Sequence, residues 1–319
     1  MFTSILVVDI GGTHLKFAAI ESGVFRELGR HVSTAEIRTA DPIDRLAALI
    51  SRVSASLDLH PEAVVSTVPG FLDPDRDRVL FAGNVPELNG HRLATELSER
   101  LGLPVFLERD AVMALRGEWE IGAGAGARNL LGLFFGTGVG SAFLQDGEPF
   151  RGAGNALEMG VMPFRRDGRA MAGMRTDCLE AYVSGRTLQA IADRHDVGIA
   201  RIFVEAAGRD DLTAELDGFL RDLMIAIGMA MHMFAPDTVL LGGGLCDMAG
   251  FPRRRIETQL ADYAPYGEVG IPMNLRWASL GWKAALQGAL HRANEAKRST
   301  LAQDGPSPGK SRTSLRASF

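Results

Sequence analysis

The sequence contains the same glycine-tipped hairpin twice, and this repeat limits the folds open to the chain. In the first copy, the apolar run of residues 5–8 leads into the tip Asp9-Ile10-Gly11-Gly12-Thr13, and a strand-like segment over residues 15–20 follows. The pair Gly12-Thr13 recurs 124 positions later as Gly136-Thr137, again between two apolar segments. An internal repeat of this kind predicts two related domains that face each other.

Strand-like and helix-like segments alternate around the two hairpins. Short apolar runs predict the strands, which lie at residues 4–8, 15–20, 63–67, 104–107, 130–135, 141–144 and 238–241. Apolar residues at helical spacing predict the helices, which lie at residues 44–57, 92–101, 111–120, 179–194, 214–234 and 282–293. This alternation is typical of an α/β fold.

The composition divides the chain into three parts. We expect an N-terminal α/β domain over residues 1–120 and a C-terminal α/β domain with helical insertions over residues 121–293. The last helix of the second domain can pack back on the first. From about Asn294 the sequence changes to Lys, Arg, Ser, Pro and Gly, which predicts a disordered tail over residues 294–319.

Charge and cysteine content exclude several classes of protein. The formal net charge is −5, from 39 acidic and 34 basic residues, without the basic stripe of a nucleic-acid-binding protein. No apolar run reaches the roughly 20 residues that span a bilayer. The two cysteines, Cys178 and Cys246, cannot form a disulfide framework, which favours a reducing compartment. We therefore expect a cytoplasmic protein with neither nucleic-acid nor membrane partners.

Both hairpin tips suit the binding of phosphate groups. Glycines let backbone N–H groups approach a phosphate closely, and a threonine adds a hydroxyl donor. The candidate residues of the two tips are Gly11, Gly12, Thr13 and Lys16 in the first and Gly136, Thr137, Gly138 and Gly140 in the second. Either tip alone can be an ordinary hairpin turn, but the repetition favours a polyphosphate bound from both sides.

Three further features lie at strand ends. Asp9 can hold Mg²⁺ through water, since that ion takes few protein carboxylates directly. Asp110 either caps the helix that follows it or acts as a general base toward a substrate hydroxyl, and spacing alone leaves both roles open. The run Gly242, Gly243 and Gly244 suits either a tight turn or close passage of the backbone against a flat ligand such as adenine.

In their order along the chain, these motifs resemble the ROK family of sugar kinases. The similarity extends from Leu6 to about Leu290 and includes further segments that lie at residues 68–70 (V-P-G), 83–86 (G-N-V-P), 108–111 (E-R-D-A), 157–160 (L-E-M-G) and 178–180 (C-L-E). The resemblance implies a two-domain actin-like ATPase (ribonuclease H-like) fold with an interdomain cleft. It also implies an ATP-dependent hexose kinase that uses Mg²⁺.

The resemblance implies a role for each matching residue. Asp110 would take the proton from the sugar hydroxyl that attacks the γ-phosphate of ATP. The residues implied to bind the sugar are Asn84, Arg109, Glu158, Glu180 and Gly70. Carboxylates suit this task because each has two acceptor oxygens for hydroxyl groups.

Three departures from the family pattern concern zinc and the sugar. A zinc loop of the family should end at Cys178, but its other cysteine positions carry Met171 and Gly173, and Asp177 precedes Cys178, so no zinc is expected. Val161 replaces a histidine that contributes to sugar binding. Arg109 replaces an asparagine, and with segments 232–237, 244–248 and 251–253 it is most similar to the D-allose kinase branch.

Several alternatives stay open at this point. Within the same class, the chain resembles a glucokinase or an N-acylhexosamine kinase. A catalytically silent sugar sensor of the ROK type is the alternative suggested by the missing zinc ligands. A transcriptional repressor is disfavoured because the first strand starts at about Ser4, which leaves no room for a winged helix before it. The family resemblance is compatible with a homodimer.

Overall fold

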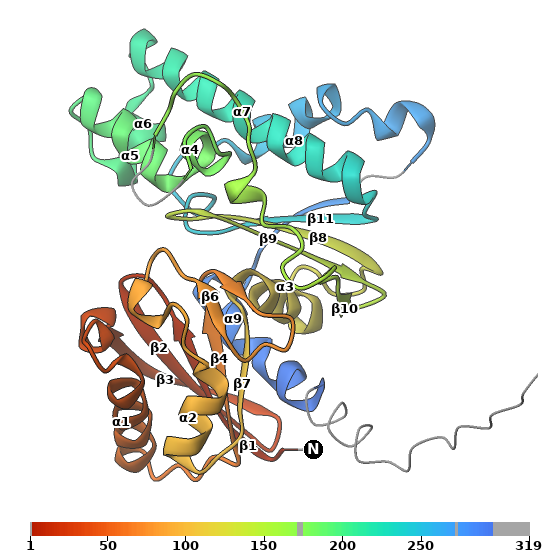
Figure 1. The fold of residues 1–319 in the computed structure, drawn as a ribbon. Helices are drawn as coiled ribbons and strands as arrows, with labels where there is room; N and C mark the ends of the chain where they lie inside the picture. The colour runs from red at the N-terminus through yellow and green to blue at the C-terminus, as the bar shows by residue number, and fades with distance from the viewer. Residues whose placement is uncertain (1, 171–174, 272–273, 296–319) are drawn as a thin grey trace, which may run out of the picture.

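The computed structural model describes residues 2–170, 175–271 and 274–295, and within these residues the strands form two five-stranded sheets and one two-stranded sheet (Figure 1). The strand order is β3-β2-β1-β4-β7 in the first sheet and β10-β9-β8-β11-β12 in the second. Each five-stranded sheet begins with a hairpin whose tip is one of the two repeated glycine segments.

The first sheet combines an antiparallel hairpin with parallel strands. Its strands are β1 (Ser4–Ile10), β2 (His14–Glu21), β3 (Val24–Ser33), β4 (Ala63–Val68) and β7 (Val105–Arg109). Because β1 and β4 are buried on both faces, their sequences are nearly continuous apolar runs. One face packs against α1 (Pro42–Ser56) and α2 (Leu93–Leu101), and a short hairpin, β5 (Phe71–Leu72) with β6 (Val79–Phe81), follows β4.

The second sheet repeats this plan. Its strands are β8 (Asn129–Phe135), β9 (Val139–Gln145), β10 (Glu148–Pro149), β11 (Thr238–Gly242) and β12 (Asn274–Trp277). Its outer face is covered by helices, which are α4 (Glu180–Val183), α5 (Gly185–Arg194), α6 (Ile202–Glu205), α7 (Asp210–Phe234) and α8 (Arg253–Gln259). The 3₁₀ turns of the chain lie at Thr34–Ile37, Pro86–Leu88, Met159–Val161, Ile199–Arg201, Leu260–Asp262, Tyr266–Val269 and Gly281–Lys283.

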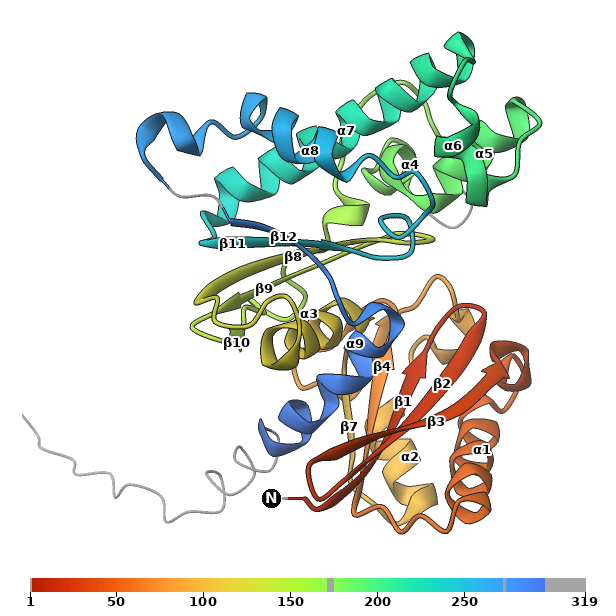
Figure 2. The same cartoon turned by 180° about the vertical axis from the view of Figure 1, so that it is seen from behind.

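Two helices lie between the sheets. The helix α3 (Asp110–Ile121) follows β7 and packs its apolar residues Val112 and Leu115 against the inner face of the second sheet. The helix α9 (Ala284–Gln287) comes from the C-terminal end of the chain and packs on the first sheet, as Figure 2 shows from behind. The chain therefore returns to its starting sheet, and α3 is held from both sides.

Several helical segments differ from the sequence-based expectation, and α7, for example, begins at Asp210 and not at residue 214. The helix predicted over residues 179–194 is two helices, because Ser184 is extended and its hydroxyl accepts the Thr187 N–H (3.3 Å) as an N-cap. The closing helix is interrupted at Gly288. Residues 289–295 are helical, so the predicted tail does not begin at 294; the rest of the tail lies outside the described residues.

None of the helices in the described ranges combines the length and apolar character needed to cross a membrane.

Candidate active site

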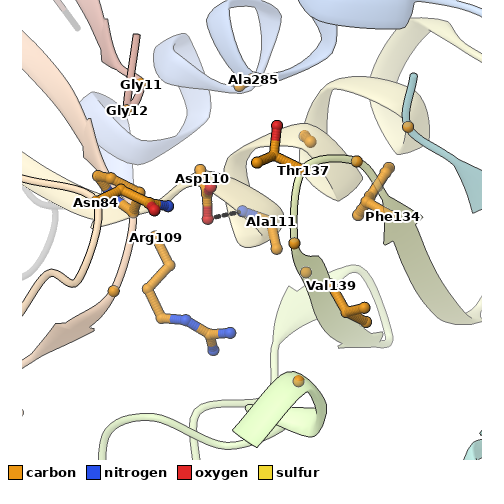
Figure 3. A pocket seen from close by; sticks show the side chains of 18 of the residues that line it. Gly11, Gly12, Asn84, Arg109, Asp110, Ala111, Phe134, Thr137, Val139 and Ala285 are labelled. Carbon is orange, nitrogen blue, oxygen red and sulfur yellow. Dashed lines mark hydrogen bonds between the residues drawn. The ribbon is translucent and has the colours of Figure 1, made fainter. Parts of the chain in front are cut away.

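A pocket of about 430 Å³ lies between the two sheets and brings most of the predicted site residues together (Figure 3). The predicted residues that line it are Asp9, Gly11, Gly12, Lys16, Gly70, Asn84, Arg109, Asp110, Gly136, Thr137, Gly138, Gly140, Glu158, Glu180 and Gly243. Three predicted residues lie beside it instead. Thr13 is exposed at the first tip, Gly242 is buried against Phe134 and Ala278, and Gly244 is exposed after β11.

Asp9 is the penultimate residue of β1 and is fixed from two sides. The Thr67 hydroxyl donates to its Oδ1 at 2.6 Å, and Lys16 Nζ lies 3.1 Å from its Oδ2. The same Thr67 oxygen accepts the Ile10 N–H at 3.1 Å. Asp9 thus presents a buried, oriented carboxylate at the wall of the pocket, beside the glycines of the first tip.

Asp110 begins α3, where Arg109 and not Asp110 occupies the N-cap position. Its Oδ1 accepts the Ala111 N–H at 2.7 Å (Figure 3). The carboxyl is enclosed between the two domains but exposed to the pocket. Desolvation there raises the pKa of Asp110, and the neighbouring Asp9 carboxylate raises it further. A carboxylate with a raised pKa is a stronger proton acceptor, as a general base requires.

The two tips and Asp110 line the same pocket. A methyl group on Gly12 would lie 3.1 Å from Asn84 Cβ, and one on Gly140 would lie 3.2 Å from Ala111 Cβ. The first tip therefore abuts the predicted sugar loop, while the second abuts the residue next to Asp110. These glycines allow a close approach of backbone segments that any larger side chain would widen.

The Glu180 carboxylate packs against the second tip. Its Oε2 accepts the Val139 N–H at 2.9 Å, which places the carboxylate within the hairpin tip. A methyl group on Gly138 would lie only 2.4 Å from that oxygen, and one on Gly160 would lie 3.2 Å from it. Burial raises the pKa of Glu180. The small residues at 138 and 160 are thus needed to admit this carboxylate.

Arg109 points away from Asp110, as Figure 3 shows, and contacts the second domain. Its Nε lies 2.7 Å from Glu158 Oε1, and its other nitrogens donate to the carbonyls of Ala156 (2.7 Å) and Ser141 (3.1 Å). Burial raises the pKa of Glu158 to about 7, although Arg109 opposes the shift. Arg109 therefore partly neutralises a carboxylate that was predicted to hold sugar hydroxyls.

Arg186 and Trp282 are among the pocket-lining residues that were not proposed from the sequence. Arg186, in the first turn of α5, donates to Asn84 Oδ1 at 2.8 Å and lies 4.0 Å from Glu180 Oε1, so it spans the pocket between the domains. The helix start at Ser184 places Arg186 there, and the apolar spacing of the sequence, which continues through Ser184, did not reveal it. Trp282 lies over Lys16, whose Nζ is 5.8 Å from the ring centroid, and no local motif marks it.

The segment that replaces the zinc loop is held by an aspartate. Asp177 accepts hydrogen bonds from the Gly168 N–H (3.1 Å), the Arg169 N–H (2.8 Å) and the Tyr182 hydroxyl (2.6 Å). The predicted non-ligands Met171 and Gly173 lie outside the described residues. Within the ranges that the structure describes, no group of three or more His, Cys, Asp and Glu side chains could hold a metal ion.

The fold and the pocket together identify the structural class of this protein. Two sheets of the same plan, each contributing a glycine tip to one interdomain pocket, constitute the two-domain actin-like ATPase architecture. A solved ROK family glucokinase from Streptomyces griseus, in complex with glucose and AMPPNP, superposes with a TM-score of 0.76 at 26% identity. The similarity covers 92% of this chain and all (100%) of that one.

The sequence comparisons identify the family. The ROK family profile matches residues 5–296, and the chain belongs to the ROK family. A glucokinase from Streptomyces coelicolor is 29% identical over 90% of this chain and 96% of its own length. A beta-glucoside kinase from Klebsiella pneumoniae is 30% identical over 92% of this chain and 97% of its own length. The predicted family and fold are therefore confirmed.

Proposed function

We propose that this protein is an ATP-dependent hexose kinase that transfers the γ-phosphate to a hydroxyl of D-allose or a related hexose. The position of Asp110 is the observation that supports it best. Asp110 opens into a pocket between two glycine tips, and each sheet contributes one of them. Membership of the ROK family and the likeness to a glucokinase bound to glucose and AMPPNP support the reaction class.

In the proposed reaction, a sugar hydroxyl oxygen forms a bond to the γ-phosphorus while the bond from that phosphorus to the bridging oxygen of ADP breaks. The hydroxyl proton passes to the Asp110 carboxylate. Asn84, Glu158 and Glu180 would hold the other hydroxyls, and the two tips would hold the phosphates. Phosphoryl transfer depends mainly on such positioning and on electrostatic stabilisation.

The donor atoms of the pocket fit Mg²⁺. Asp9 presents carboxylate oxygens, which this hard cation prefers, and Thr67 already orients it. Asp9 would hold the ion through water. When bound, Mg²⁺ neutralises charge on the phosphates. Lys16, beside Asp9, supplies a further positive charge at the same end of the pocket.

The choice of sugar is the finer part of the proposal. The D-allose assignment is supported by Arg109 and by the local sequence segments described above. Glucose is the principal alternative, because a glucokinase is among the similar proteins. A silent sugar sensor is disfavoured, because Asp9, Asp110 and both tips are present and line one pocket.

A sugar panel with coupled ADP detection tests the proposal. The purified protein with Mg-ATP should phosphorylate D-allose or a close relative faster than glucose or N-acylhexosamines. Asp110→Asn, which keeps the side-chain shape, should lower kcat by about 10²–10⁴-fold because the proton acceptor is lost. Asp146→Asn, in the exposed turn after β9, is the matched control and should keep full activity.

Three results would contradict parts of this proposal. No ADP release with any sugar would refute the kinase assignment, and sugar binding by calorimetry without turnover would favour the sensor. Full activity of Asp110→Asn would refute the role of that residue as the base. A preference for glucose over D-allose would refute the sugar assignment alone.

A further inference from the structure

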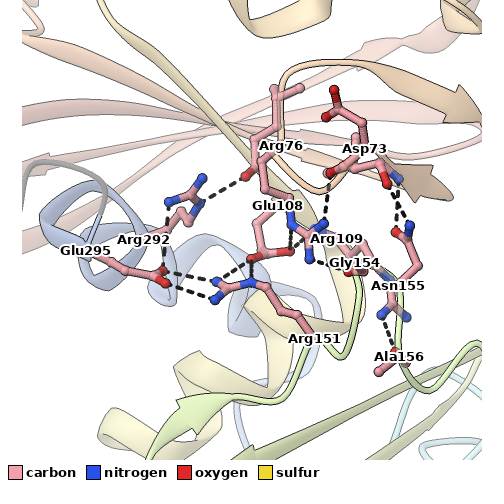
Figure 4. A network of polar contacts seen from close by, with 12 residues as sticks. Asp73, Arg76, Glu108, Arg109, Arg151, Gly154, Asn155, Ala156, Arg292 and Glu295 are labelled. Carbon is pink, nitrogen blue, oxygen red and sulfur yellow. Dashed lines mark hydrogen bonds and ion pairs between the residues drawn. The ribbon is translucent and has the colours of Figure 1, made fainter. Parts of the chain in front are cut away.

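A second polar cluster lies between the domains, around a residue two positions before the candidate base (Figure 4). Its centre is Glu108, the penultimate residue of β7, whose side chain is 1% exposed. Guanidinium groups from separate parts of the chain surround it: Arg76 follows β5, Arg151 follows β10, and Arg292 lies near the C-terminal end of the described chain. Charged residues are rarely buried this completely unless they are paired.

The two oxygens of Glu108 have different partners. Oε1 accepts hydrogen bonds from Arg76 Nε (3.1 Å) and from the Arg109 N–H (3.0 Å), both within the first domain. Oε2 accepts from Arg151 Nε (3.0 Å) and Nη2 (2.7 Å), which belong to the second domain. One carboxylate therefore joins the two domains, and its contact with the second domain is two charge-assisted hydrogen bonds from one guanidinium group to the same oxygen.

The surrounding groups reinforce this connection. Arg76 also donates to the Gly154 carbonyl of the second domain at 2.6 Å. Arg151 donates to both oxygens of Glu295, at 2.9 and 3.1 Å, and Arg292 donates to the Leu107 carbonyl at 2.9 Å. Burial alone would raise the pKa of Glu108, but the nearby guanidinium groups outweigh it and lower the pKa, so the carboxylate stays ionised.

In each domain, the residue that makes this contact is connected to a part of the candidate active site. In the first domain, Glu108 is two residues before Asp110 and binds the intervening Arg109 N–H. In the second domain, Arg151 follows Phe150, whose N–H donates to the Phe143 carbonyl in β9 at 2.8 Å. The strand β9 begins at the second glycine tip, where Gly140 faces Ala111.

We propose that Glu108 and Arg151 are positioning residues that hold Asp110 in register with the phosphate-binding tip of the opposite domain. This inference depends on the proposed function, because it assigns the pair a task in that reaction. Loss of the contact would let the base and the γ-phosphate drift apart while each half of the site stays intact. A displacement of about 1 Å at the reacting atoms can reduce the rate about 10²-fold.

The test compares two variants of the same interdomain segment. Arg151→Met removes the contact to Glu108 but leaves Arg76 beside the carboxylate. Asn155→Ala, the control, removes the two hydrogen bonds between Asn155 and the Leu72 backbone, which also join the domains but do not touch Glu108. Arg151→Met should lower kcat at least tenfold, with the KM for ATP within about twofold of wild type, whereas Asn155→Ala should keep kcat within about threefold.

A double variant separates positioning from loss of stability. If Glu108 and Arg151 act through one contact, Glu108→Gln combined with Arg151→Met should have a kcat no lower than that of Glu108→Gln alone. Leu97→Ala, in the core of the first domain, lowers the thermal midpoint without touching this cluster and should leave kcat unchanged. Arg151→Lys keeps the positive charge but has one donor nitrogen where arginine uses two, so its kcat should lie between those of wild type and Arg151→Met.

The outcomes that refute the inference are distinct from those that refute the proposed function. A folded Arg151→Met with kcat within twofold of wild type, or an equal loss in Asn155→Ala, refutes the positioning role alone. If Arg151→Met does not fold, a wild-type kcat in Arg151→Lys would likewise refute the positioning role. Absence of turnover by the wild-type protein refutes the proposed function and this inference with it.

Discussion

Replacement of Gly138 by alanine should displace Glu180 from the active site. The two residues compete for space, because an added methyl group would lie 2.4 Å from Glu180 Oε2 and 2.8 Å from its Cδ. Carbon and oxygen atoms in ordinary contact are about 3.4 Å or more apart, so one group has to move. The carboxylate is the end of a flexible side chain and will move before the backbone does.

The magnitude follows from what Glu180 loses when it moves. Its Oε2 accepts the Val139 N–H at 2.9 Å, and its side chain is 12% exposed. A hydrogen bond to a charged group contributes about 1.5–3 kcal/mol, so the free energy of unfolding should fall by up to that amount. If the same carboxylate binds the sugar, kcat/KM for the sugar should fall by about 10–150-fold, since each 1.4 kcal/mol is tenfold.

Differential scanning calorimetry and sugar kinetics provide the assay, with Gly136→Ala as the control in the same tip. None of the described atoms lies within 4 Å of a methyl group added at Gly136, and its φ is not positive, so that variant should be as stable as wild type. In a Glu180→Ala background the cost of Gly138→Ala should disappear. An equal cost in both backgrounds would refute the competition between the methyl group and the carboxylate.

Two further predictions concern pH and metal. The folded protein raises the pKa of Glu158 to about 7 from an ordinary value of 4.5, so this group favours the folded state at low pH and that contribution is lost as the pH rises toward 7. The thermal midpoint of wild type relative to Glu158→Gln should therefore fall between pH 5 and 8, and parallel curves would contradict it. EDTA should leave the thermal midpoint unchanged, because Asp177, and not a metal ion, holds its segment through hydrogen bonds with Arg169 and Tyr182. Asp177→Ala should lower the thermal midpoint. A fall of several degrees with EDTA would contradict the role given to Asp177.

Features that depend on short stretches of chain were predictable from the sequence. The two tips are defined by glycines within a few residues of a buried strand, and Asp110 follows β7 directly, so the pattern was enough to place them. The break at Ser184 was not predictable by the same means. Apolar spacing continues through it on both sides, and only the hydrogen bond from the Thr187 N–H to the Ser184 hydroxyl shows that a new helix starts there.

The Glu108 cluster was beyond prediction because its members are distant in sequence. Arg76 and Arg151 are 32 and 43 positions from Glu108, and nothing in the local sequence around either indicates a carboxylate partner. Glu108 itself was visible only as part of a family segment, just beyond the strand predicted over residues 104–107, and neither its burial nor the balance of its charge was predicted. The contacts appear only when the second sheet packs against the first.

Arg109 connects Glu158, which lines the pocket, with this interdomain cluster. Its N–H donates to Glu108, while its guanidinium reaches Glu158 and the carbonyls of Ala156 and Ser141 across the domain boundary. An asparagine, which the family pattern has here, is too short to make these side-chain contacts. The arginine therefore changes the charge around the predicted sugar carboxylate and adds an interdomain contact at once. If Glu158 binds the sugar as proposed, sugar selection and the alignment of the two domains are coupled through this one side chain, and Arg109→Asn should alter both.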